Sequence, residues 1–238
     1  QGTVTLAHLQ GSVTVRYDDR GVPHIRAENE ADLYRALGYV HAQDRLFQME
    51  IMRRLARGEL AEVLGPKLLE TDKLFRSLRI RERALSYVEH MDPGSASSKA
   101  LQAYLDGINQ YQDSHASPME FDVLGIAKRP FTAEDSISVA GYMAYSFAAA
   151  FRTEPVLTYV RDRLGSAYLN VFDLDWQPKG ALNLAASDWQ TLGAIAALSE
   201  KALADNGLPQ FEGSNAWAVS GSHTQSGKPL LAGDPHIR

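Results

Sequence analysis

The feature that most constrains the fold is a long stretch in which apolar residues return at helical spacing. It runs from Glu30 to Leu64, where Gly65-Pro66 ends it, and Gly58 marks a break within it. Its apolar positions are Leu33, Leu37, Val40, Leu46, Phe47, Ile51, Leu55 and Leu60. A helix turns once every 3.6 residues, so this spacing places apolar side chains on one face. The stretch therefore predicts a long helix that is interrupted near Gly58.

Short strands are predicted near the two ends of the chain. Val13–Tyr17 and Val22–Ile25 flank a turn that contains Gly21, which is typical of a β-hairpin. Beyond the helix-breaking residues 206–209, Ala216–Val219 and Pro229–Ala232 flank a second turn in the same way. The chain therefore ends in the beginning of a sheet.

The residues between the two hairpins are predicted to be mostly helical. Thr132 opens one of these helices, because Asp135 stands three residues later as a capping partner. The predicted helices cover residues 68–91, 97–111, 132–150, 155–164 and 192–204, and residues 118–130 are predicted to be loop. The expected fold class is α+β, with a mainly helical region followed by the first strands of a sheet.

Composition excludes several classes of function. The net charge is −5, and the densest basic residues, Arg53, Arg54 and Arg57, alternate with acids, so no nucleic-acid surface is expected. No cysteine is present, which excludes disulfides, zinc–thiolate sites and a cysteine nucleophile. The most apolar run, residues 139–151, is shorter than the roughly 20 residues that span a bilayer. We expect neither a nucleic-acid nor a membrane partner.

The segment most suggestive of chemistry is Glu212-Gly213-Ser214-Asn215, which lies where the helical pattern gives way to the strand pattern. A Gly-Ser step in this position is also compatible with an ordinary turn before a strand. An ordinary serine hydrolase with a Ser–His–Asp triad is disfavoured, because the chain lacks a Gly-x-Ser-x-Gly elbow. Gly221-Ser222-His223 is a poor substitute for that elbow.

Three separated motifs resemble the penicillin acylase family. Ser214-Asn215-Ala216-Trp217 resembles the junction between the family's two mature chains, and Gly227–Leu231 and Asp234-Pro235-His236 follow it at the family's spacing. Near the start, Tyr17–Ile25 resembles the family's opening hairpin, and Gly38–Met49 resembles its first long helix. The resemblance extends over nearly the whole chain.

The resemblance implies an N-terminal-nucleophile hydrolase with a four-layer αββα sandwich. Residues 1–197 then correspond to the helical α-chain, residues 198–213 to a spacer, and residues 214–238 to the beginning of the β-chain. The chain stops directly after an apolar run, without a helix cap, so we expect a fragment whose sheet is completed by the remainder of the β-chain. We expect this fragment by itself to be inactive.

The expected nucleophile is Ser214, released as a chain terminus by cutting the Gly213–Ser214 bond. A serine hydroxyl needs a base beside it, and a terminal serine carries one in its own α-amine, with a pKa of about 7.7–8.0. Before cutting, the same hydroxyl would attack the Gly213 carbonyl and form an ester that water opens. Gly213 has no Cβ, which leaves its carbonyl open to attack.

The resemblance also assigns supporting residues. His236 is expected to orient the nucleophile and to donate to the oxyanion; the alternative is an inert histidine at a strand end. Met143 and Phe147 are spaced i, i+4, so they share one helix face and are expected to line the acyl pocket; ordinary core packing is the alternative. Ser146 stands where penicillin G acylases have arginine, which puts phenylacetyl specificity in doubt and leaves a long apolar acyl group as at least an equal alternative.

No cofactor is expected for catalysis, although the resemblance implies a structural calcium ion. Glu154 is the candidate ligand, and a solvated glutamate near a helix start is the alternative. His24 and His41 lie within the family motifs and are interpreted as structural hydrogen-bonding residues. No metal-binding histidine motif and no phosphate-binding glycine loop is present.

The predicted function is that of an autoprocessed acylase, which hydrolyses a linear amide bond through an acyl-enzyme on Ser214. Its substrate would be an acylated small molecule such as a β-lactam, an acyl-homoserine lactone or a lipopeptide. The family and the non-methionine start imply a periplasmic or secreted location. The alternative is an uncut, non-catalytic helical relative that only binds.

Overall fold

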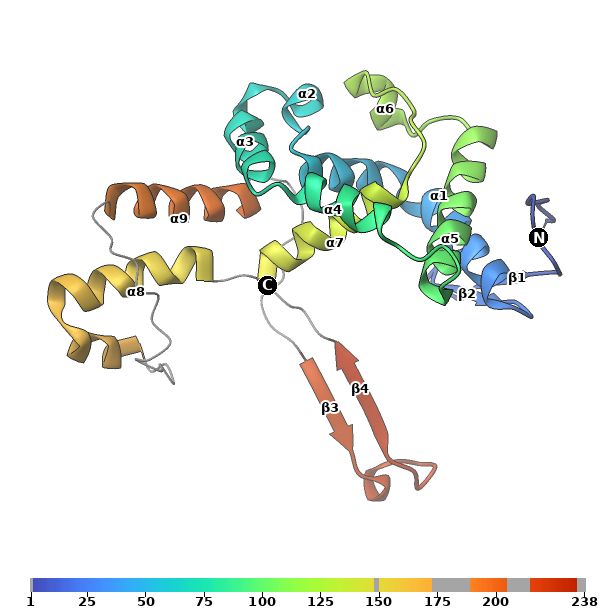
Figure 1. Ribbon diagram of the computed structural model, residues 1–238. Helices are drawn as coiled ribbons and strands as arrows, with labels where there is room; N and C mark the ends of the chain where they lie inside the picture. The colour runs from blue at the N-terminus through green and yellow to red at the C-terminus, as the bar shows by residue number, and fades with distance from the viewer. Residues whose placement is uncertain (1, 148–149, 173–188, 205–214, 235–238) are drawn as a thin grey trace. The chain divides into compact units, whose positions relative to one another are not determined.

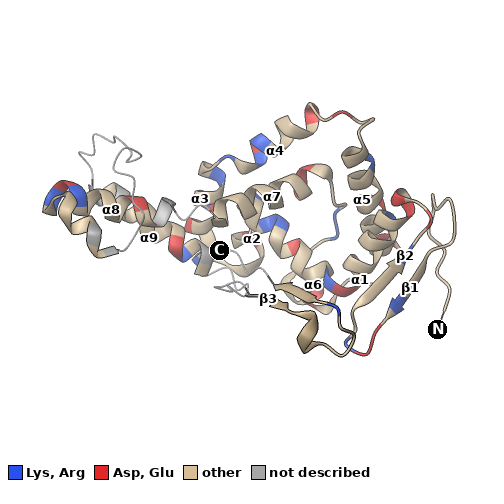
Figure 2. Cartoon of the chain, turned by 90° about the horizontal axis from the view of Figure 1, so that it is seen from below, with Lys and Arg blue, Asp and Glu red and all other residues tan. Residues whose placement is uncertain are grey.

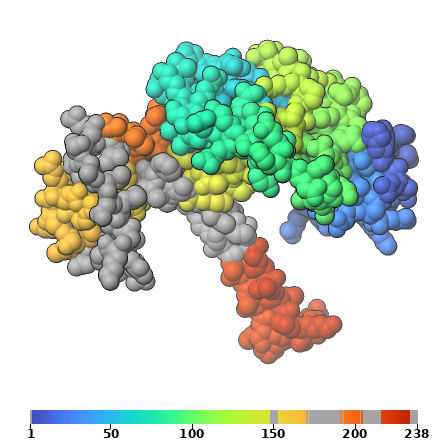
Figure 3. All heavy atoms as spheres, in the orientation of Figure 1, coloured from blue at the N-terminus to red at the C-terminus, as the bar shows by residue number. Residues whose placement is uncertain are grey.

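The computed structural model describes residues 2–147, 150–172, 189–204 and 215–234. The chain divides into two units, which we call unit 1 (residues 1–142) and unit 2 (residues 143–238). Unit 1 holds the first pair of strands and the helices up to most of α7, and unit 2 holds α8, α9 and the second pair of strands (Figure 1). The atoms of unit 1, blue to yellow-green in Figure 3, form a closely packed body.

The first hairpin pairs β1 (Thr14–Tyr17) with β2 (Pro23–Arg26) in antiparallel register. The Asp18 carboxylate closes the turn, because its Oδ1 accepts the backbone N–H groups of Arg20 and Val22, each at 2.9 Å. Gly21 has a φ of 77°, a left-handed conformation that glycine adopts without steric cost. The first predicted hairpin is therefore confirmed.

The predicted long helix is confirmed as α1 (Glu30–Arg57). Asn29 caps its start, since its side chain accepts the backbone N–H of Asp32 at 2.9 Å. Gly58, with a φ of 66°, ends it in the left-handed conformation that is common at helix C-termini. Arg45 has non-helical backbone angles (φ −140°, ψ 19°), so the helix is kinked in its middle.

Helix α5 (Ala96–Ser114) packs along α1 with the two backbones in contact. A Cβ added to Gly38 of α1 would lie 2.0 Å from the carbonyl oxygen of Tyr104. One added to Gly107 of α5 would lie 1.9 Å from the carbonyl oxygen of Arg35. Neither position accepts a larger residue without moving the helices apart, so these two glycines determine how closely α1 and α5 approach.

The single helix predicted over residues 68–91 is wrong. After α2 (Ala61–Leu64) and the 3-10 turn η1 (Pro66–Leu68), the structure has α3 (Leu69–Ser77) and α4 (Ile80–Glu89). Arg79 between them has a φ of 55°, which costs of order 1–3 kcal/mol for a residue with a side chain. The turn brings Ile80 within contact of Gly141 on α7, so burial of Ile80 offsets the local cost.

The segment predicted as loop over 118–130 contains a short helix, α6 (Met119–Leu124). Its Phe121 is 1% exposed and belongs to the core between α1 and α5. The buried residues of this core are Ala42, Leu46, Leu105, Ile108, Phe121, Ile126, Phe131 and Ala133. Burial of Phe121 and Ile126 in this core therefore orders a segment whose local pattern indicates a loop.

Helix α7 (Ala133–Phe147) begins as predicted. The Thr132 hydroxyl and backbone N–H both donate to Asp135 Oδ2 at 3.0 Å, and the Asp135 N–H donates back to the hydroxyl at 3.3 Å. This reciprocal pair is a capping box, and it places Asp135 in the first turn of the helix.

Unit 2 contains α8 (Ala150–Leu164), the 3-10 segment η2 (Ser166–Phe172) and α9 (Trp189–Ala204). Helix α8 starts before the predicted residue 155, so Pro155 lies inside it. Helices α8 and α9 pack together and bury Leu157 and Ala202. The buried hydroxyls of Tyr145 and Ser199 are hydrogen-bonded, which joins α9 to the end of α7.

The second hairpin pairs β3 (Asn215–Val219) with β4 (Leu230–Asp234), and the turn between them includes η4 (Gly221–His223). Both strands are slightly longer than predicted. The expected fold class is confirmed, because the described chain is mostly helical with two short hairpins. Within the described residues, no helix is both long and apolar enough to cross a membrane.

Candidate functional site

The second hairpin leads directly to the predicted nucleophile. Ser214, Gly213 and His236 lie outside the described residues, but the strand ends next to them are described. Asn215 pairs with Asp234 in the antiparallel register. Ser214 is bonded to Asn215, and His236 stands two residues after Asp234, so the chain continues toward both from one end of the hairpin.

The hairpin is apolar on both faces. Side chains alternate along a strand, so Trp217, Val219 and Leu230 share one face, and Leu231 shares the other with two alanines of β3. Trp217 is 57% exposed, Leu230 60% and Leu231 84%. Figure 2 draws β3 without a charged residue. Trp217 is therefore exposed, because β4 pairs with only one edge of β3 and no layer covers its face among the described residues.

Helix α7 presents the predicted acyl-binding residues as exposed side chains. Met143 is 51% exposed and Phe147 is 41% exposed, although both are large and apolar. Tyr145, between them in sequence, is buried against α9. Among the described residues, Met143 and Phe147 are therefore not packed into a core. Their role toward an acyl group stays a prediction.

Glu154 lies in α8 and is partly exposed. No group of three or more histidine, aspartate or glutamate side chains that could hold a metal ion occurs among the described residues. A calcium ion prefers six to eight oxygen ligands, so Glu154 could supply only one of them. The predicted calcium site stays a prediction.

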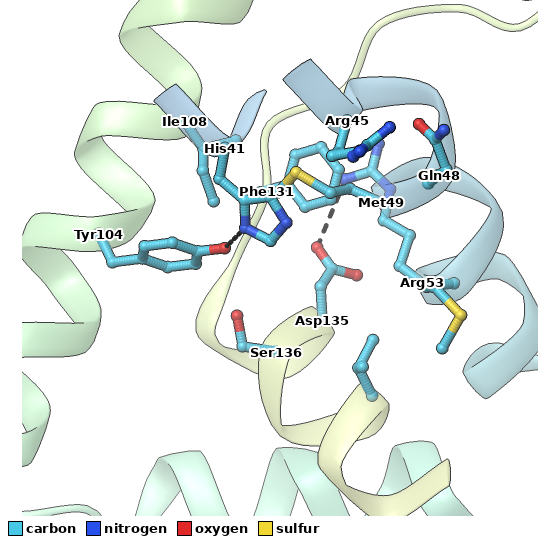
Figure 4. Close-up of a pocket in the computed structure, with 12 residues that line it drawn as sticks. His41, Arg45, Gln48, Met49, Arg53, Tyr104, Ile108, Phe131, Asp135 and Ser136 are labelled. Carbon is cyan, nitrogen blue, oxygen red and sulfur yellow. Dashed lines mark hydrogen bonds and ion pairs between the residues drawn. The ribbon is translucent and has the colours of Figure 1, made fainter. Parts of the chain in front are cut away.

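A pocket of about 470 Å³ lies within unit 1, between α1, α5 and the start of α7 (Figure 4). The apolar part of its lining comes from Met49, Met52, Ile108, Phe131 and Val139. The polar part comes from His41, Arg45, Gln48, Arg53, Tyr104, Asp135 and Ser136. We call this cavity the α1–α5–α7 pocket.

His41 and Tyr104 face each other in this pocket, with Nδ1 of the ring 2.6 Å from the hydroxyl oxygen (Figure 4). Burial, and secondarily the charge of Arg45, holds the pKa of His41 below its ordinary value, while Asp44 opposes the shift. Burial also raises the pKa of Tyr104. A neutral imidazole can accept the proton of the hydroxyl, so the predicted hydrogen-bonding role of His41 is confirmed. His24 likewise has a partner, Asp18, at 3.2 Å.

A buried cluster of charges borders the pocket and shares Arg53 and Asp135 with its lining. Glu50 is fully buried, and its Oε1 accepts from Arg54 Nε at 2.6 Å and its Oε2 from Arg53 Nε at 2.6 Å. Arg53 is 1% exposed, stacks 3.9 Å from the centre of the Phe131 ring, and lies 3.5 Å from Asp135. Arg57 also binds Asp135, at 2.9 Å. The cluster therefore ties α1 to the first turn of α7.

Sequence reasoning missed both the pocket and the cluster. Arg53, Arg54 and Arg57 alternate with acids, a pattern that is equally typical of a solvated helix face. The capping box at Thr132 gave the one available signal, because it correctly placed Asp135 at the start of α7. That Asp135 also meets arginines of α1 depends on tertiary contacts between residues about 80 positions apart in the chain.

Comparison with known proteins identifies related chains. Residues 12–238 match the family model described as penicillin amidase. Penicillin acylase 2 proenzyme of Pseudomonas sp. (strain SE83) is 36% identical over 244 residues, which cover 99% of this chain and 31% of the relative. Acyl-homoserine lactone acylase QuiP of Pseudomonas aeruginosa is 29% identical over 258 residues, covering 99% of this chain and 29% of the relative.

A solved structure agrees with these matches. A thermostable penicillin G acylase from Alcaligenes faecalis superimposes with a TM-score of 0.53 and 26% sequence identity, over 68% of this chain and 88% of the solved one. The chain thus spans about a third of the length of the curated relatives it matches.

Proposed function

The chain belongs to the penicillin amidase family, and from this premise we propose that the protein it forms part of is an autoprocessed acylase. This acylase would hydrolyse the linear amide bond of an acylated small molecule through an acyl-enzyme on Ser214. The proposal concerns the complete protein, because the chain spans only 31% of the relative from Pseudomonas sp. (strain SE83). That relative is named a proenzyme, which supports a processing step.

The observation that carries the proposal is the register of the second hairpin. Asn215 pairs with Asp234, so the chain leaves toward Ser214 and toward His236 from the same end of the two strands. A catalytic nucleophile and its helper must lie close together to act on one carbonyl. The antiparallel pairing supports such an arrangement, whereas a slip in register would carry the two residues apart.

Processing would use the hydroxyl of Ser214 against its own peptide bond. The hydroxyl oxygen attacks the Gly213 carbonyl carbon, the bond from that carbon to the Ser214 nitrogen breaks, the hydroxyl proton passes to that nitrogen, and an ester remains. Water then attacks the ester and yields the Gly213 carboxylate and the free Ser214 α-amine. The step creates the base that turnover needs, because an amide nitrogen is not basic and an α-amine has a pKa of about 7.7–8.0.

Turnover would repeat this chemistry on the substrate. The Ser214 amine takes the hydroxyl proton while the oxygen attacks the substrate carbonyl, and the proton then passes to the departing amine. Water hydrolyses the resulting acyl ester and releases the carboxylic acid. His236 would donate to the negative oxygen of the tetrahedral intermediate, a type of interaction that is worth about 2.7–4 kcal/mol in acyl transfer.

The acyl group is proposed to be apolar and to contact α7. Met143 and Phe147 offer exposed apolar surface on one face of this helix, and Ser146 between them is small and uncharged. The named activities of the relatives, toward penicillins and acyl-homoserine lactones, both fit an acylated small molecule as substrate. Glu154 would be one ligand of a structural calcium ion, which would take no part in the reaction.

The test is the denaturing mass of the complete gene product, compared with its Ser214→Ala variant. We expect two chains from the wild type, one beginning at Ser214, and one uncut chain from the variant. Amide hydrolysis should fall by a factor of at least about 10⁴ in the variant, because the nucleophile is lost. Two uncut and equally inactive proteins would instead support the non-catalytic binding relative.

A conservative variant separates processing from a general loss of folding. Ser214→Cys keeps a nucleophile at the same position and should still be cut. If Ser214→Cys is cut and Ser214→Ala is not, the nucleophile is assigned. If both variants are cut like the wild type, Ser214 is not the residue that attacks.

A further inference from the structure

The end of α7 has an exposed apolar side and a buried side. Met143 and Phe147 are exposed, whereas Tyr145 between them is only 8% exposed. Successive positions of a helix are rotated by about 100°, so a residue two positions from both neighbours points to the opposite side. The direction in which α7 presents its two apolar side chains therefore depends on what holds Tyr145.

Tyr145 is held by a hydrogen bond to another helix. Its hydroxyl and that of Ser199 on α9 are hydrogen-bonded to each other, and Ser199 is 2% exposed. A rotation of the end of α7 would separate these two buried hydroxyls, and a buried hydroxyl that loses its partner destabilises the fold. A hydrogen bond also depends on direction, so it fixes one orientation more strictly than apolar packing does.

The helix that provides Ser199 is itself anchored. Helix α9 packs along α8 (Figure 1), and Ala202, three positions after Ser199 and on the same side of the helix, is 0% exposed. Leu157 of α8 is buried as well. All of these residues, together with Met143, Tyr145 and Phe147, belong to unit 2. The end of α7 therefore has a fixed partner within its own unit.

We propose that Tyr145 and Ser199 are positioning residues for selection of the acyl group, because their hydrogen bond sets the direction in which α7 presents Met143 and Phe147. The proposal rests on the proposed acylase, in which those two side chains contact the acyl group. Both hydroxyls are buried, so they act through α7 and not by contact with the substrate. Ser199 falls within residues 198–213, the predicted spacer, so this role requires that α9 stays in the mature protein.

The test measures hydrolysis of two linear amides, the p-nitroanilides of butyric and decanoic acid, by the complete gene product. Tyr145→Phe keeps the ring and removes the hydroxyl. The KM for the decanoyl anilide should rise, and the ratio of kcat/KM should shift toward the butyryl anilide by at least about fivefold, because a longer acyl group depends more on a correctly directed apolar face. The kcat for the butyryl anilide should stay within about twofold of the wild type, since the nucleophile is unchanged.

Variants of the partner residue separate positioning from simple loss of packing. Ser199→Ala should shift the ratio in the same direction, and Ser199→Thr should return it to within about twofold of the wild type, because threonine keeps the hydroxyl. Tyr168→Phe removes the same group from a tyrosine of η2 that is 56% exposed, so it is the matched control and should leave the ratio unchanged.

Three results would overturn the proposal. One is an unchanged ratio in both Tyr145→Phe and Ser199→Ala, and another is an equal shift in Tyr168→Phe. The third is that Tyr145→Phe and Ser199→Ala fail to fold while Ser199→Thr folds, because the hydrogen bond would then hold the fold without selecting the acyl group.

The denaturing mass of the mature α-chain tests the other requirement. We expect an α-chain that still contains Ser199, because removal of residues 198–213 would interrupt α9 (Trp189–Ala204) and delete the buried Ser199 and Ala202. An α-chain that ends before Ser199 would contradict the proposal, since the mature protein would lack the partner of Tyr145.

The outcome is separable from that of the proposed function. A cut and active protein whose acyl preference ignores Tyr145→Phe would keep the acylase and refute the positioning role. For an uncut and inactive protein, calorimetric affinities for butyrate and decanoate replace the rates. A preference for decanoate that Tyr145→Phe lowers, and Tyr168→Phe does not, would keep the positioning role and refute the hydrolase; no such preference would refute both.

Discussion

The charged cluster of unit 1 buries charged side chains, whereas the second hairpin exposes apolar ones. In the cluster, Glu50 is fully buried and Arg53 is 1% exposed, yet each has several partners. In the hairpin, Leu231 is 84% exposed and Trp217 is 57% exposed, although both are apolar. Charged groups are thus buried where each has a partner of opposite charge, and apolar groups are exposed on the two-stranded hairpin.

The difference lies in where each region finds its partners. Buried charges are tolerated only when each has hydrogen-bonding partners, and the cluster supplies all of its partners from within unit 1. In the hairpin, β3 and β4 pair with each other, and their apolar side chains stay exposed among the described residues. The cluster of unit 1 therefore has its partners within that unit, whereas the hairpin exposes apolar side chains on both faces.

The largest expected effect comes from breaking the cluster. Glu50→Gln removes the buried charge that both Arg53 and Arg54 bind, which leaves Arg53 with Asp135 at 3.5 Å and Arg54 with the exposed Glu62 as acidic partners among the described residues. We expect the free energy of unfolding of the complete protein to fall by about 3–5 kcal/mol, measured by urea denaturation.

Glu70→Gln is the matched control for this change. Glu70 pairs with Lys73 at 2.7 Å, but their side chains are 62% and 59% exposed. Water screens such a pair, so the loss should not exceed about 1 kcal/mol. Equal losses for Glu50→Gln and Glu70→Gln would show that the buried cluster does not hold α1 to α7.

A smaller and conditional effect is expected in the hairpin. Leu231→Asp should change the stability of residues 1–238 by less than about 0.5 kcal/mol, because the side chain is exposed. In the proposed two-chain protein the same change should cost about 1.5–3 kcal/mol, because there we expect the leucine to be buried in a larger sheet. Thermal unfolding of both forms measures the difference.

Gln225→Asp, in the exposed turn of the same hairpin, controls for the added charge. It should have little effect in either form. If Leu231→Asp is as harmless as Gln225→Asp in the complete protein, this face of the hairpin stays exposed and the hairpin is not an inner part of a sheet.

The smallest expected effect concerns pH. The folded pKa of His41 is lowered, mainly by burial, so the unfolded chain binds its proton more readily than the folded one. Stability should therefore decline as the pH falls below about 6.5, the unfolded value, until the pH is below the folded pKa. His41→Gln, which still offers Tyr104 an acceptor, should reduce the drop in melting temperature between pH 7 and pH 5.

His90→Gln provides the comparison, because His90 is exposed at the end of α4 and lies outside the pocket. A pH dependence that is unchanged by His41→Gln, or reduced equally by both substitutions, would contradict the assignment.

Local sequence determined much of the secondary structure. The cap at Asn29, the left-handed stop at Gly58 and the capping box of Thr132 and Asp135 each depend on residues a few positions apart. Both hairpins follow from turn residues and alternating strands for the same reason. The order and spacing of the motifs around Ser214 also indicated the family that the comparisons show. Short-range interactions can be read from a sequence because both partners are adjacent in it.

Tertiary structure alone decided the rest. The left-handed turn at Arg79 follows from the packing of Ile80 on Gly141, and α6 follows from the burial of Phe121. The burial of Glu50 and Arg53, and the pocket around Arg45, depend on α1, α5 and α7 meeting in space. Each of these arrangements is stabilised by residues that are distant in the chain, so no local sequence pattern indicates it.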